Sequence, residues 1–239
     1  MTLDLGLAGR RVVVTGGASG IGAAVVGVLR DAGARVTAID LRGADVDADV
    51  TREEQVASAF ARVSAEFGAA VDGLVCCAGI SGPVGTPAVE VSATDFARVQ
   101  DVNVLGAFLS VRGAAPLLRA GADPSVVLLA SDSSFTSAPG MAPYCTSKGA
   151  LLALGRSLAV DLRPEGVRVN CLCPSVVDTP MSRTDLELPQ GFSGSSYPVQ
   201  TPEQVAGLVA LLLSPLTAAV NGTHLLADFG MSAASPFPA

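Results

Sequence analysis

The 239-residue sequence contains twenty-two acidic and fifteen basic residues, carries a net charge of −7, and is 49% hydrophobic. This acidic balance, without any run of basic residues, disfavours a nucleic-acid-binding function. No apolar stretch reaches the roughly 18 residues of a membrane-spanning helix, and the first residues lack the apolar core of a signal peptide. We therefore expect a cytoplasmic protein without a membrane partner, whose core is built mainly from Ala, Val and Leu.

Short runs rich in Val and Leu alternate along the chain with longer stretches of helical period. The runs predict strands at residues 11–15, 35–40, 45–49 (the weakest), 71–77, 126–130, 168–172 and 223–227. The stretches between them predict helices at residues 21–32, 53–67, 104–118, 147–162 and 203–213. Such alternation builds βαβ units, so we expect one α/β domain over residues 1–239, with a doubly wound parallel sheet of about seven strands.

Two segments lack such a pattern. Residues 182–201 contain Gly, Ser and Pro without a clear period, which predicts a mobile substrate loop. Residues 232–239 predict a tail that packs on a neighbouring subunit.

The segment TGGASGIG, Thr15 to Gly22, follows the first predicted strand and opens directly into a helix. Glycines at such a bend permit a tight turn and let the backbone approach a pyrophosphate, while the helix N-terminus offers N–H groups and a positive dipole end. Tight turns also use glycine for backbone reasons alone. The flanking strand and helix, with an acid at the end of the next strand, favour a dinucleotide-binding site.

That acid, Asp40, bears on which dinucleotide binds. Its carboxylate can accept hydrogen bonds from the adenosine ribose hydroxyls and would repel a 2′-phosphate, so we predict NAD rather than NADP as the cofactor. Arg42 could soften the repulsion, and a solvated strand-end acid is the alternative interpretation of Asp40. Further along, we expect Asp49 beside the adenine amino group and Val50 against the ring.

TGGASGIG and the segment YCTSK, Tyr144 to Lys148, resemble motifs of the short-chain dehydrogenase/reductase family, whose members are NAD(P)-dependent oxidoreductases with a Rossmann fold. Further motifs of that family follow in order along essentially the whole chain. They are CCAG at 76–79, DVNVLGAF at 101–108, a serine thirteen residues before the tyrosine, RVNCLCPSVVDTPM at 168–181 and LADFG at 226–230. The resemblance also implies a homotetramer, with the helices that begin near Asn103 and Ser147 at the contacts.

Lys148 is the only lysine among fifteen basic residues, and it follows Tyr144 by four positions. The two side chains therefore lie on one face at the start of a predicted helix. Tyrosine, with an ordinary pKa near 10, is a poor base at neutral pH, and a nearby ammonium lowers that pKa toward the working range. We predict that Tyr144 moves a proton at the substrate oxygen while hydride moves at the carbon.

The resemblance assigns catalysis to Asn103, Ser131, Tyr144 and Lys148. Ser131 would stabilise charge on the substrate oxygen, with Ser133 and Ser134 as rivals, and Asn103 would hold a water that links Lys148 to solvent. Thr179 would bind the nicotinamide carboxamide, helped by the backbone at Val177. The predicted cofactor contacts are Gly16, Ser19, Gly20, Ile21, Gly22, Asp40, Leu41, Asp49, Val50, Cys77, Ala78, Gly79, Tyr144, Lys148, Pro174, Val177 and Thr179, and the predicted substrate contacts are Ser133, Met181 and Tyr197.

The sequence departs from the family pattern at three places. The usual NNAG is CCAG, the usual Pro-Gly is Pro174-Ser175, and Phe229 replaces a glycine in LADFG. None of these changes removes a predicted catalytic group. The five cysteines lack zinc-type spacing with His224, the only histidine, so we expect reduced thiols and no metal, with His224 in a structural position.

These observations favour an NAD-dependent dehydrogenase or reductase of a secondary alcohol or ketone. The segments AIDLRGADV and LVCCAG are similar to bacterial hydroxysteroid dehydrogenases of the family, which suggests a hydrophobic, cyclic small-molecule substrate. Reduction of a 3-oxoacyl thioester on an acyl carrier is the alternative enzyme function, although Asp40 and the net charge of −7 disfavour it. A dinucleotide-sensing regulator is the non-enzymatic alternative.

Overall fold

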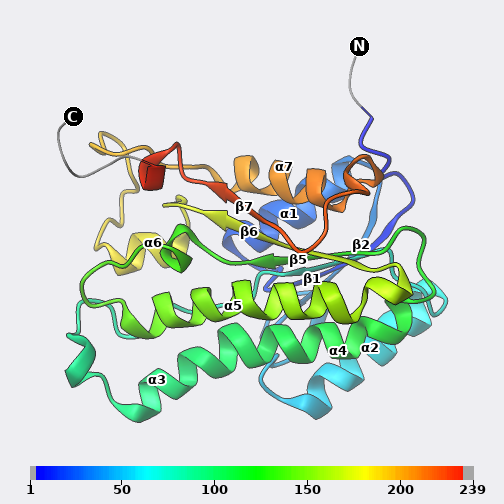
Figure 1. Ribbon diagram of the computed structural model, residues 1–239, viewed down its shortest axis with the longest axis horizontal. Helices are drawn as coiled ribbons and strands as arrows, with labels where there is room; N and C mark the ends of the chain where they lie inside the picture. Colours follow the sequence, from blue (N-terminus) through cyan, green and yellow to red (C-terminus); the bar gives the residue numbers. More distant parts are fainter. Residues whose placement is uncertain (1–3, 234–239) are drawn as a thin grey trace.

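The computed structural model describes residues 4–233, which form one seven-stranded sheet with every strand parallel to its neighbours (Figure 1). The strand order is β3-β2-β1-β4-β5-β6-β7, so the direction of winding reverses between β1 and β4. Open sheets of this kind bind ligands beyond the carboxyl ends of the strands at the reversal. The strands are β1 (Arg11–Thr15), β2 (Arg35–Asp40), β3 (Val46–Asp47), β4 (Gly73–Cys76), β5 (Ser125–Leu129), β6 (Arg168–Pro174) and β7 (His224–Ala227).

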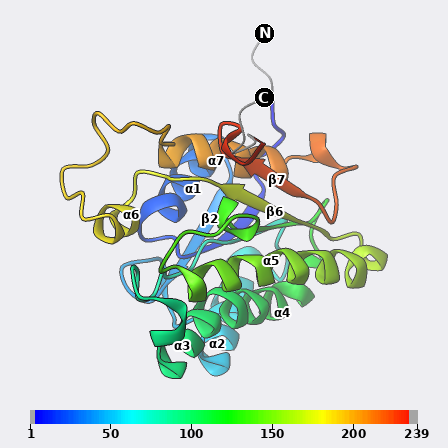
Figure 2. The same ribbon diagram turned by 60° about the vertical axis from the view of Figure 1, so that its left-hand side comes forward.

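Helices cover both faces of the sheet (Figures 1 and 2). Helices α1 and α7 pack on one face, and α2, α4 and α5 cover the other. No helix among residues 4–233 is both long and apolar enough to cross a bilayer. The helices are α1 (Gly20–Asp31), α2 (Glu53–Phe67), α3 (Ala93–Gln100), α4 (Gly106–Leu118), α5 (Ala142–Asp161), α6 (Pro180–Asp185) and α7 (Pro202–Leu213).

Alternation of side chains along each strand divides the core into two layers. In β1, Val13 packs with α2, α4 and α5, whereas Val12 and Val14 pack with α1 and α7. All three side chains are fully buried. Because parallel strands are covered on both faces, they appear in the sequence as continuous apolar runs.

The doubly wound parallel sheet of about seven strands that the sequence predicted is confirmed, and so is the helix at residues 53–67 at both ends. The helix predicted at 104–118 begins instead at Gly106, after a π-helical turn at Asp101–Leu105. Helix α5 begins at Ala142 rather than at residue 147, so Tyr144 lies in its first turn.

Two further elements were not predicted. Helix α3 is short and has one buried residue, Val99, which leaves almost no apolar period to detect. Helix α6 occupies the start of the predicted loop at 182–201, and Thr179 caps it through a reciprocal pair of hydrogen bonds with Ser182. Most of the tail predicted at 232–239 lies outside the described residues.

A buried ionic cluster joins strands at the end of the sheet opposite the reversal site. Asp72 accepts two hydrogen bonds from the Arg11 guanidinium, at 2.9 and 2.7 Å, and others from the backbone N–H groups of Arg11 and Ala122. Beside it, Arg10 donates to three carbonyl oxygens, including that of Asp72. Burial alone would raise the pKa of Asp72, but the hydrogen bonds from Arg11 and Ala122 outweigh it and lower the pKa to about 2.

We expect Asp72→Asn to lower the free energy of unfolding by about 2 kcal/mol at pH 7, because the change from 3.8 to about 2 corresponds to roughly this energy. The folded-state pKa lies below the unfolded value, so the contribution is complete above pH 3.8 and is lost as pH falls through 2. Urea unfolding of both proteins at pH 7 and at the lowest pH that still permits folding measures it. Glu53→Gln, which breaks the exposed pair with Arg112, is the control and should change stability little. Equal losses in the two variants would contradict the assignment.

Candidate active site

The glycine-rich turn is packed so closely that it admits no side chain at two positions. A Cβ on Gly16, whose φ is 72°, would approach the backbone nitrogen of Ala78 to 2.5 Å. A Cβ on Gly22 would overlap the carbonyl oxygen of Gly16. The turn therefore brings β1, β4 and the N-terminus of α1 together, and it leaves backbone N–H groups at that N-terminus for an anion.

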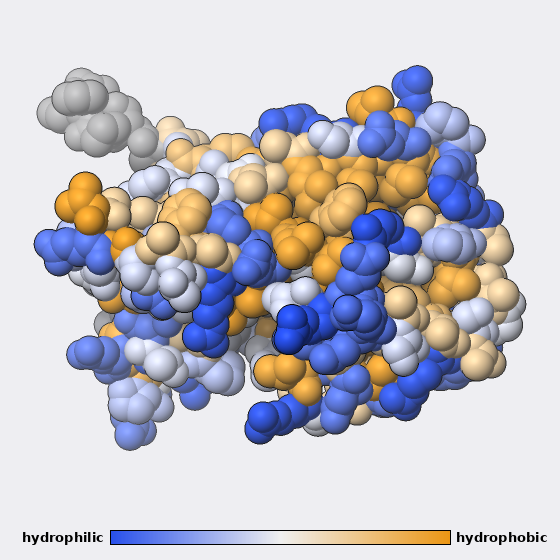
Figure 3. Space-filling model, turned by 90° about the horizontal axis from the view of Figure 1, so that it is seen from below, coloured by the Kyte–Doolittle hydropathy of each residue, from blue (hydrophilic) through white to orange (hydrophobic). Residues whose placement is uncertain are grey.

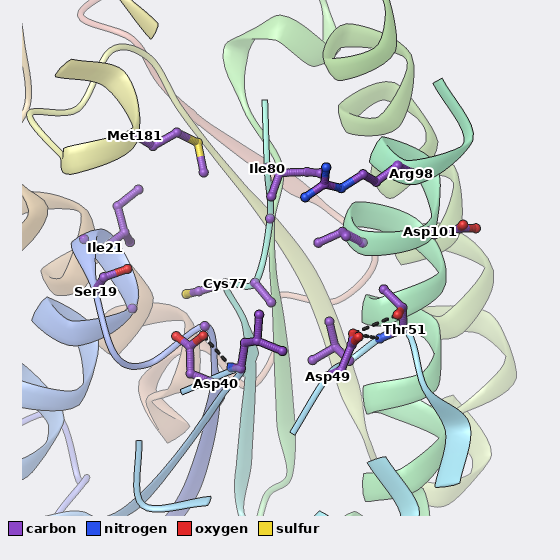
Figure 4. Close-up of a pocket in the computed structure, with 18 of the residues that line it drawn as sticks. Ser19, Ile21, Asp40, Asp49, Thr51, Cys77, Ile80, Arg98, Asp101 and Met181 are labelled. Carbon is purple, nitrogen blue, oxygen red and sulfur yellow. Dashed lines mark hydrogen bonds between the residues drawn. The ribbon is translucent and has the colours of Figure 1, made fainter. Parts of the chain in front are cut away.

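Next to this turn, a cleft of about 870 Å³ opens at the carboxyl end of the sheet (Figure 4). Its lining contains thirteen of the predicted cofactor contacts, namely Gly16, Ser19, Gly20, Ile21, Gly22, Asp40, Leu41, Asp49, Val50, Cys77, Ala78, Gly79 and Thr179. The bare glycine cradle, the free helix N-terminus and the acids at the far end fit a dinucleotide, with its pyrophosphate at the turn and its adenosine near β2.

Two acids in the cleft are held in place by local hydrogen bonds. Asp40 accepts from the backbone N–H groups of Ala18 and Leu41, at 3.0 and 2.7 Å, so its carboxylate also ties the glycine turn to β2. Asp49 accepts from the backbone and hydroxyl of Thr51 through one oxygen, Oδ1. The other oxygen accepts from no described residue, so it can serve a ligand amino group (Figure 4).

Lys148 is buried beneath Tyr144 on the same face of α5. Its Nζ lies 5.4 Å from the centroid of the tyrosine ring and donates a hydrogen bond of 2.7 Å to the carbonyl oxygen of Leu129. Burial lowers the pKa of Lys148 to about 8. Ionised at neutral pH, the ammonium therefore occupies a site that penalises its charge.

The expected lowering of the tyrosine pKa is not found in the cofactor-free protein. Burial of the phenol raises the pKa of Tyr144 to about 12, and the carboxylates of Asp132 and Asp185 add to the rise while the hydroxyl of Ser131 opposes it. The sequence analysis considered only the lysine four residues away. It could not foresee the two acids, of which Asp132 lies in the short 3-10 turn after β5 and Asp185 ends α6.

Ser131 follows β5 and is buried, as its predicted role requires. Its hydroxyl donates to Asp132 at 2.9 Å and accepts from the backbone of Ser133 at 3.1 Å. The rival serines are occupied elsewhere, since Ser133 donates to the same carboxylate and Ser134 donates to the carbonyl oxygen of Lys148. Ser131 is therefore the serine whose hydroxyl interacts with Tyr144.

Asn103 lies in the π-helical turn and is buried. Its oxygen accepts from the backbone N–H of Ile80, and its nitrogen donates to the carbonyl oxygen of Ile80 and to the hydroxyl of Ser147, all within 2.9 Å. The side chain thus fixes the cleft wall against α5. The amide oxygen can accept a second hydrogen bond, so the water assigned to Asn103 by the sequence analysis stays a prediction.

The remaining predicted residues lie around β6 and α6. Pro174 and Val177 are buried behind the cleft, while Met181 lines it on the exposed face of α6. Thr179 caps α6, so its hydroxyl is shared between Ser182 and the cleft. Tyr197, which is 37% exposed, and Ser133 are not among the residues that line this cleft, and neither are Ser131, Tyr144 and Lys148. The substrate contacts of Ser133 and Tyr197 therefore stay a prediction.

One wall of the cleft was missed by the sequence analysis. It is built by β3, the segment after β4, and α3 with the following turn, through Ala48, Thr51, Ile80, Ala93, Thr94, Ala97, Arg98, Asp101 and Val102. The spacing of Ala93, Ala97 and Asp101, four residues apart, was a signal that one helical face lies here.

The CCAG departure is accommodated by packing. Cys76 is buried beside Ala107, and Cys77 turns toward the cleft (Figure 4). Burial raises the pKa of both thiols, which makes them weak nucleophiles. All five cysteines are free thiols, and His224 lies on β7 against the ring of Phe135, with ring centroids 5.0 Å apart.

Comparison with known proteins agrees with this geometry. A family model described as enoyl-(acyl carrier protein) reductase, a short-chain dehydrogenase/reductase model, matches residues 16–232. The chain belongs to the short-chain dehydrogenase/reductase family. It is 34% identical to the mitochondrial borneol dehydrogenase of Lavandula x intermedia, over 95% of this chain and 92% of the relative.

Two solved structures of the family show the same fold. The ligand-free aldohexose dehydrogenase of Thermoplasma acidophilum has a TM-score of 0.91 at 29% identity, with 99% of each chain covered. The 3-ketoacyl-(acyl-carrier-protein) reductase of Brucella melitensis, in complex with NADH, has a TM-score of 0.85 at 29% identity, with 95% of this chain and 99% of that chain covered. The protein is thus an oxidoreductase of this family, built for a nicotinamide dinucleotide.

We expect Lys148→Met to stabilise the fold at pH 7 by up to about 3 kcal/mol, because it removes a buried charge whose pKa has moved from 10.5 to about 8. The folded-state pKa is below the unfolded one, so the penalty is complete below pH 8 and fades as pH rises toward 10.5. Urea unfolding at pH 7 and pH 10 measures the change. Arg156→Met on the exposed side of α5 is the control. A lysine variant that is less stable at pH 7 would refute the expectation.

Proposed function

We propose that this protein is an NAD-dependent dehydrogenase of cyclic secondary alcohols, working reversibly as a ketone reductase. The observation that carries the cofactor choice is Asp40, whose carboxylate faces the cleft where the adenosine ribose would lie. Among the described residues that line the cleft, none beside Asp40 is basic, and Arg42 is not part of the lining. A 2′-phosphate would meet a carboxylate without a compensating cation, which supports NAD over NADP.

In the proposed reaction, Tyr144 takes the proton of the substrate hydroxyl as the carbon–oxygen double bond forms. A nicotinamide held in the cleft would supply the acceptor for the hydride that leaves the carbinol carbon. Ser131 donates a hydrogen bond to the substrate oxygen, and Asp132 holds that hydroxyl in place beforehand. Lys148 stabilises the phenolate by its charge, and Asn103 positions the wall that faces it. In the reverse direction Tyr144 returns the proton.

A pKa of about 12 in the cofactor-free protein means that Tyr144 begins as a phenol. Alcohol oxidation then requires its ionisation, so the rate should rise with pH. Ketone reduction requires the protonated phenol and should fall with rising pH. The rates of oxidation and reduction should therefore change with pH in opposite directions, because both depend on the phenol proton of Tyr144.

The substrate class is supported by the cleft and by one relative. Ile80 and Met181 give the catalytic end an apolar lining, which suits a hydrophobic cyclic alcohol of the hydroxysteroid type. Borneol, the alcohol in the name of the 34% identical relative, is a cyclic alcohol of this kind. The second candidate, reduction of a 3-oxoacyl thioester, is favoured by the structural neighbour from Brucella melitensis.

Steady-state kinetics with cyclohexanol, borneol, a hydroxysteroid and a 3-oxoacyl thioester, each with both cofactors, test the proposal. We expect kcat/KM for a cyclic alcohol to be roughly tenfold or more higher with NAD than with NADP.

The Tyr144→Phe variant should still bind NADH, as measured by fluorescence, and its kcat should fall by a factor of about 10² or more. Lys148→Met should lose activity while gaining stability.

Two results would overturn this assignment. A clear preference for NADPH and the thioester would favour the second candidate. NADH binding without turnover of any compound would favour a dinucleotide-sensing regulator.

We also propose a homotetramer in the cytoplasm, a location that suits five free thiols. Apolar side chains gather on the face of the molecule seen in Figure 3. Phe96 on α3, Leu105 in the π-helical turn and Phe108 on α4 are each 38–40% exposed. Such a patch on an isolated chain indicates a protein contact.

Light scattering should give a molar mass about four times the 23.9 kDa of one chain. Phe108→Arg on α4 should lower that mass, whereas Val89→Arg, which changes an exposed residue outside this helical face, should not. A monomeric wild-type protein would refute the assembly.

A further inference from the structure

The carboxylate of Asp185 joins two elements at the catalytic end of the cleft. Its Oδ1 accepts a hydrogen bond of 2.9 Å from the hydroxyl of Ser81, which lies 104 residues away along the chain, in the segment after β4. Each partner adjoins a residue that lines the cleft, since Ser81 follows Ile80 and Asp185 lies one helical turn after Met181 on α6 (Figure 4). The Ser81–Asp185 contact therefore holds α6 against the segment after β4.

Asp185 also lies near the reacting phenol. Burial raises the pKa of Tyr144 to about 12, and the charge of Asp185 adds to this rise, so the carboxylate is within electrostatic reach of the phenol. Like Tyr144, Asp185 is not among the residues that line the cleft for the dinucleotide. A substrate whose alcohol oxygen meets Tyr144 and Ser131 therefore has this carboxylate nearby.

One oxygen of the Asp185 carboxylate is unused within residues 4–233. Oδ1 accepts from Ser81, whereas Oδ2 accepts from no donor in that part of the chain, and the five ion pairs there do not include Asp185. The side chain is half-buried, and burial raises its pKa, so water stabilises the charge poorly. A carboxylate oxygen in this state is a place for a hydrogen-bond donor of a ligand.

The surroundings favour a neutral donor. Lys148 already places a buried ammonium beneath Tyr144, and an oxidised nicotinamide would bring a second positive charge, so a cationic substrate would be repelled. The lining beside Asp185 is apolar, through Ile80 and Met181. A hydroxyl group donates a hydrogen bond without adding charge, and a carboxylate accepts such a bond strongly.

We propose that Asp185 determines substrate specificity by accepting a hydrogen bond from a second hydroxyl group, so that the preferred substrate is a cyclic diol. This inference rests on the proposed function, in which Tyr144 takes the proton of the first hydroxyl. The hydrocarbon ring then contacts Ile80 and Met181, while Ser81 holds the carboxylate in position.

Steady-state kinetics with cyclohexanol and the isomeric cyclohexanediols test this role. We expect kcat/KM for at least one diol to exceed that for cyclohexanol by about tenfold, because a hydrogen bond to a charged group contributes on that order. Asp185→Ala should abolish this preference and change kcat/KM for cyclohexanol by no more than about threefold. Glu187→Gln, which removes the charge of an exposed acid two residues further on, is the matched control and should keep the preference.

Ser81→Ala separates recognition from closure of the cleft. It breaks the same contact between α6 and the segment after β4 but leaves the carboxylate, so the preference for the diol should persist. If the contact only closes the cleft, both alanine variants will lower kcat/KM for cyclohexanol and the diols alike, which would overturn the proposal.

Two further results would overturn it. One is a wild-type protein that oxidises cyclohexanol and every diol with equal kcat/KM. The other is a preference for an aminocyclohexanol over the diols, because the recognised group would then be a cation. A wild-type protein that binds NADH but oxidises none of these alcohols with either cofactor would instead refute the proposed function itself.

Discussion

The site depends on one buried amide, that of Asn103. Its three hydrogen bonds join the segment after β4, the π-helical turn and the second turn of α5. These segments carry the cleft wall at Ile80 and the Tyr144–Lys148 pair. Because both edges of a primary amide are needed, no other side chain of similar size satisfies all three partners. The π-helical turn points the Asn103 side chain inward, whereas in a regular α-helix the same residue would point in a different direction.

Around that link the protein accepts unfavourable electrostatics. Burial lowers the pKa of Lys148 to about 8, and no carboxylate pairs with this lysine among residues 4–233. Burial also raises the pKa of Tyr144, and two nearby carboxylates add to the rise. At neutral pH the charged Lys148 therefore costs folding free energy, whereas Tyr144 is a neutral phenol in both the folded and the unfolded chain. The cost is offset elsewhere, for example by Asp72, whose hydrogen bonds outweigh its burial at the other end of the sheet.

The sequence predicted the features that short-range patterns encode. The strands, the glycine turn and the spacing of Tyr144 and Lys148 depend on apolar runs, on backbone freedom and on the helical repeat, all of which are local. Helix α3, with Val99 as its one buried residue, gave no such signal. Arg98 lies on this helix, so it was missed as a lining residue of the cleft for the same reason. The raised pKa of Tyr144 arises from its burial and, to a smaller extent, from Asp132 and Asp185. Asp185 comes from α6, in a segment predicted as a loop.

The acids near the phenol give the cofactor a further part in the chemistry. Burial of the phenol, together with Asp132 and Asp185, disfavours the phenolate of Tyr144. An oxidised nicotinamide carries a positive charge and would offset those carboxylates at the moment when a base is required. The same acids favour the neutral phenol after the ring has become neutral NADH, which suits ketone reduction. Coupling between the charge of the ring and the proton on Tyr144 therefore follows from the position of two carboxylates, and it would let one site serve both directions of the reaction.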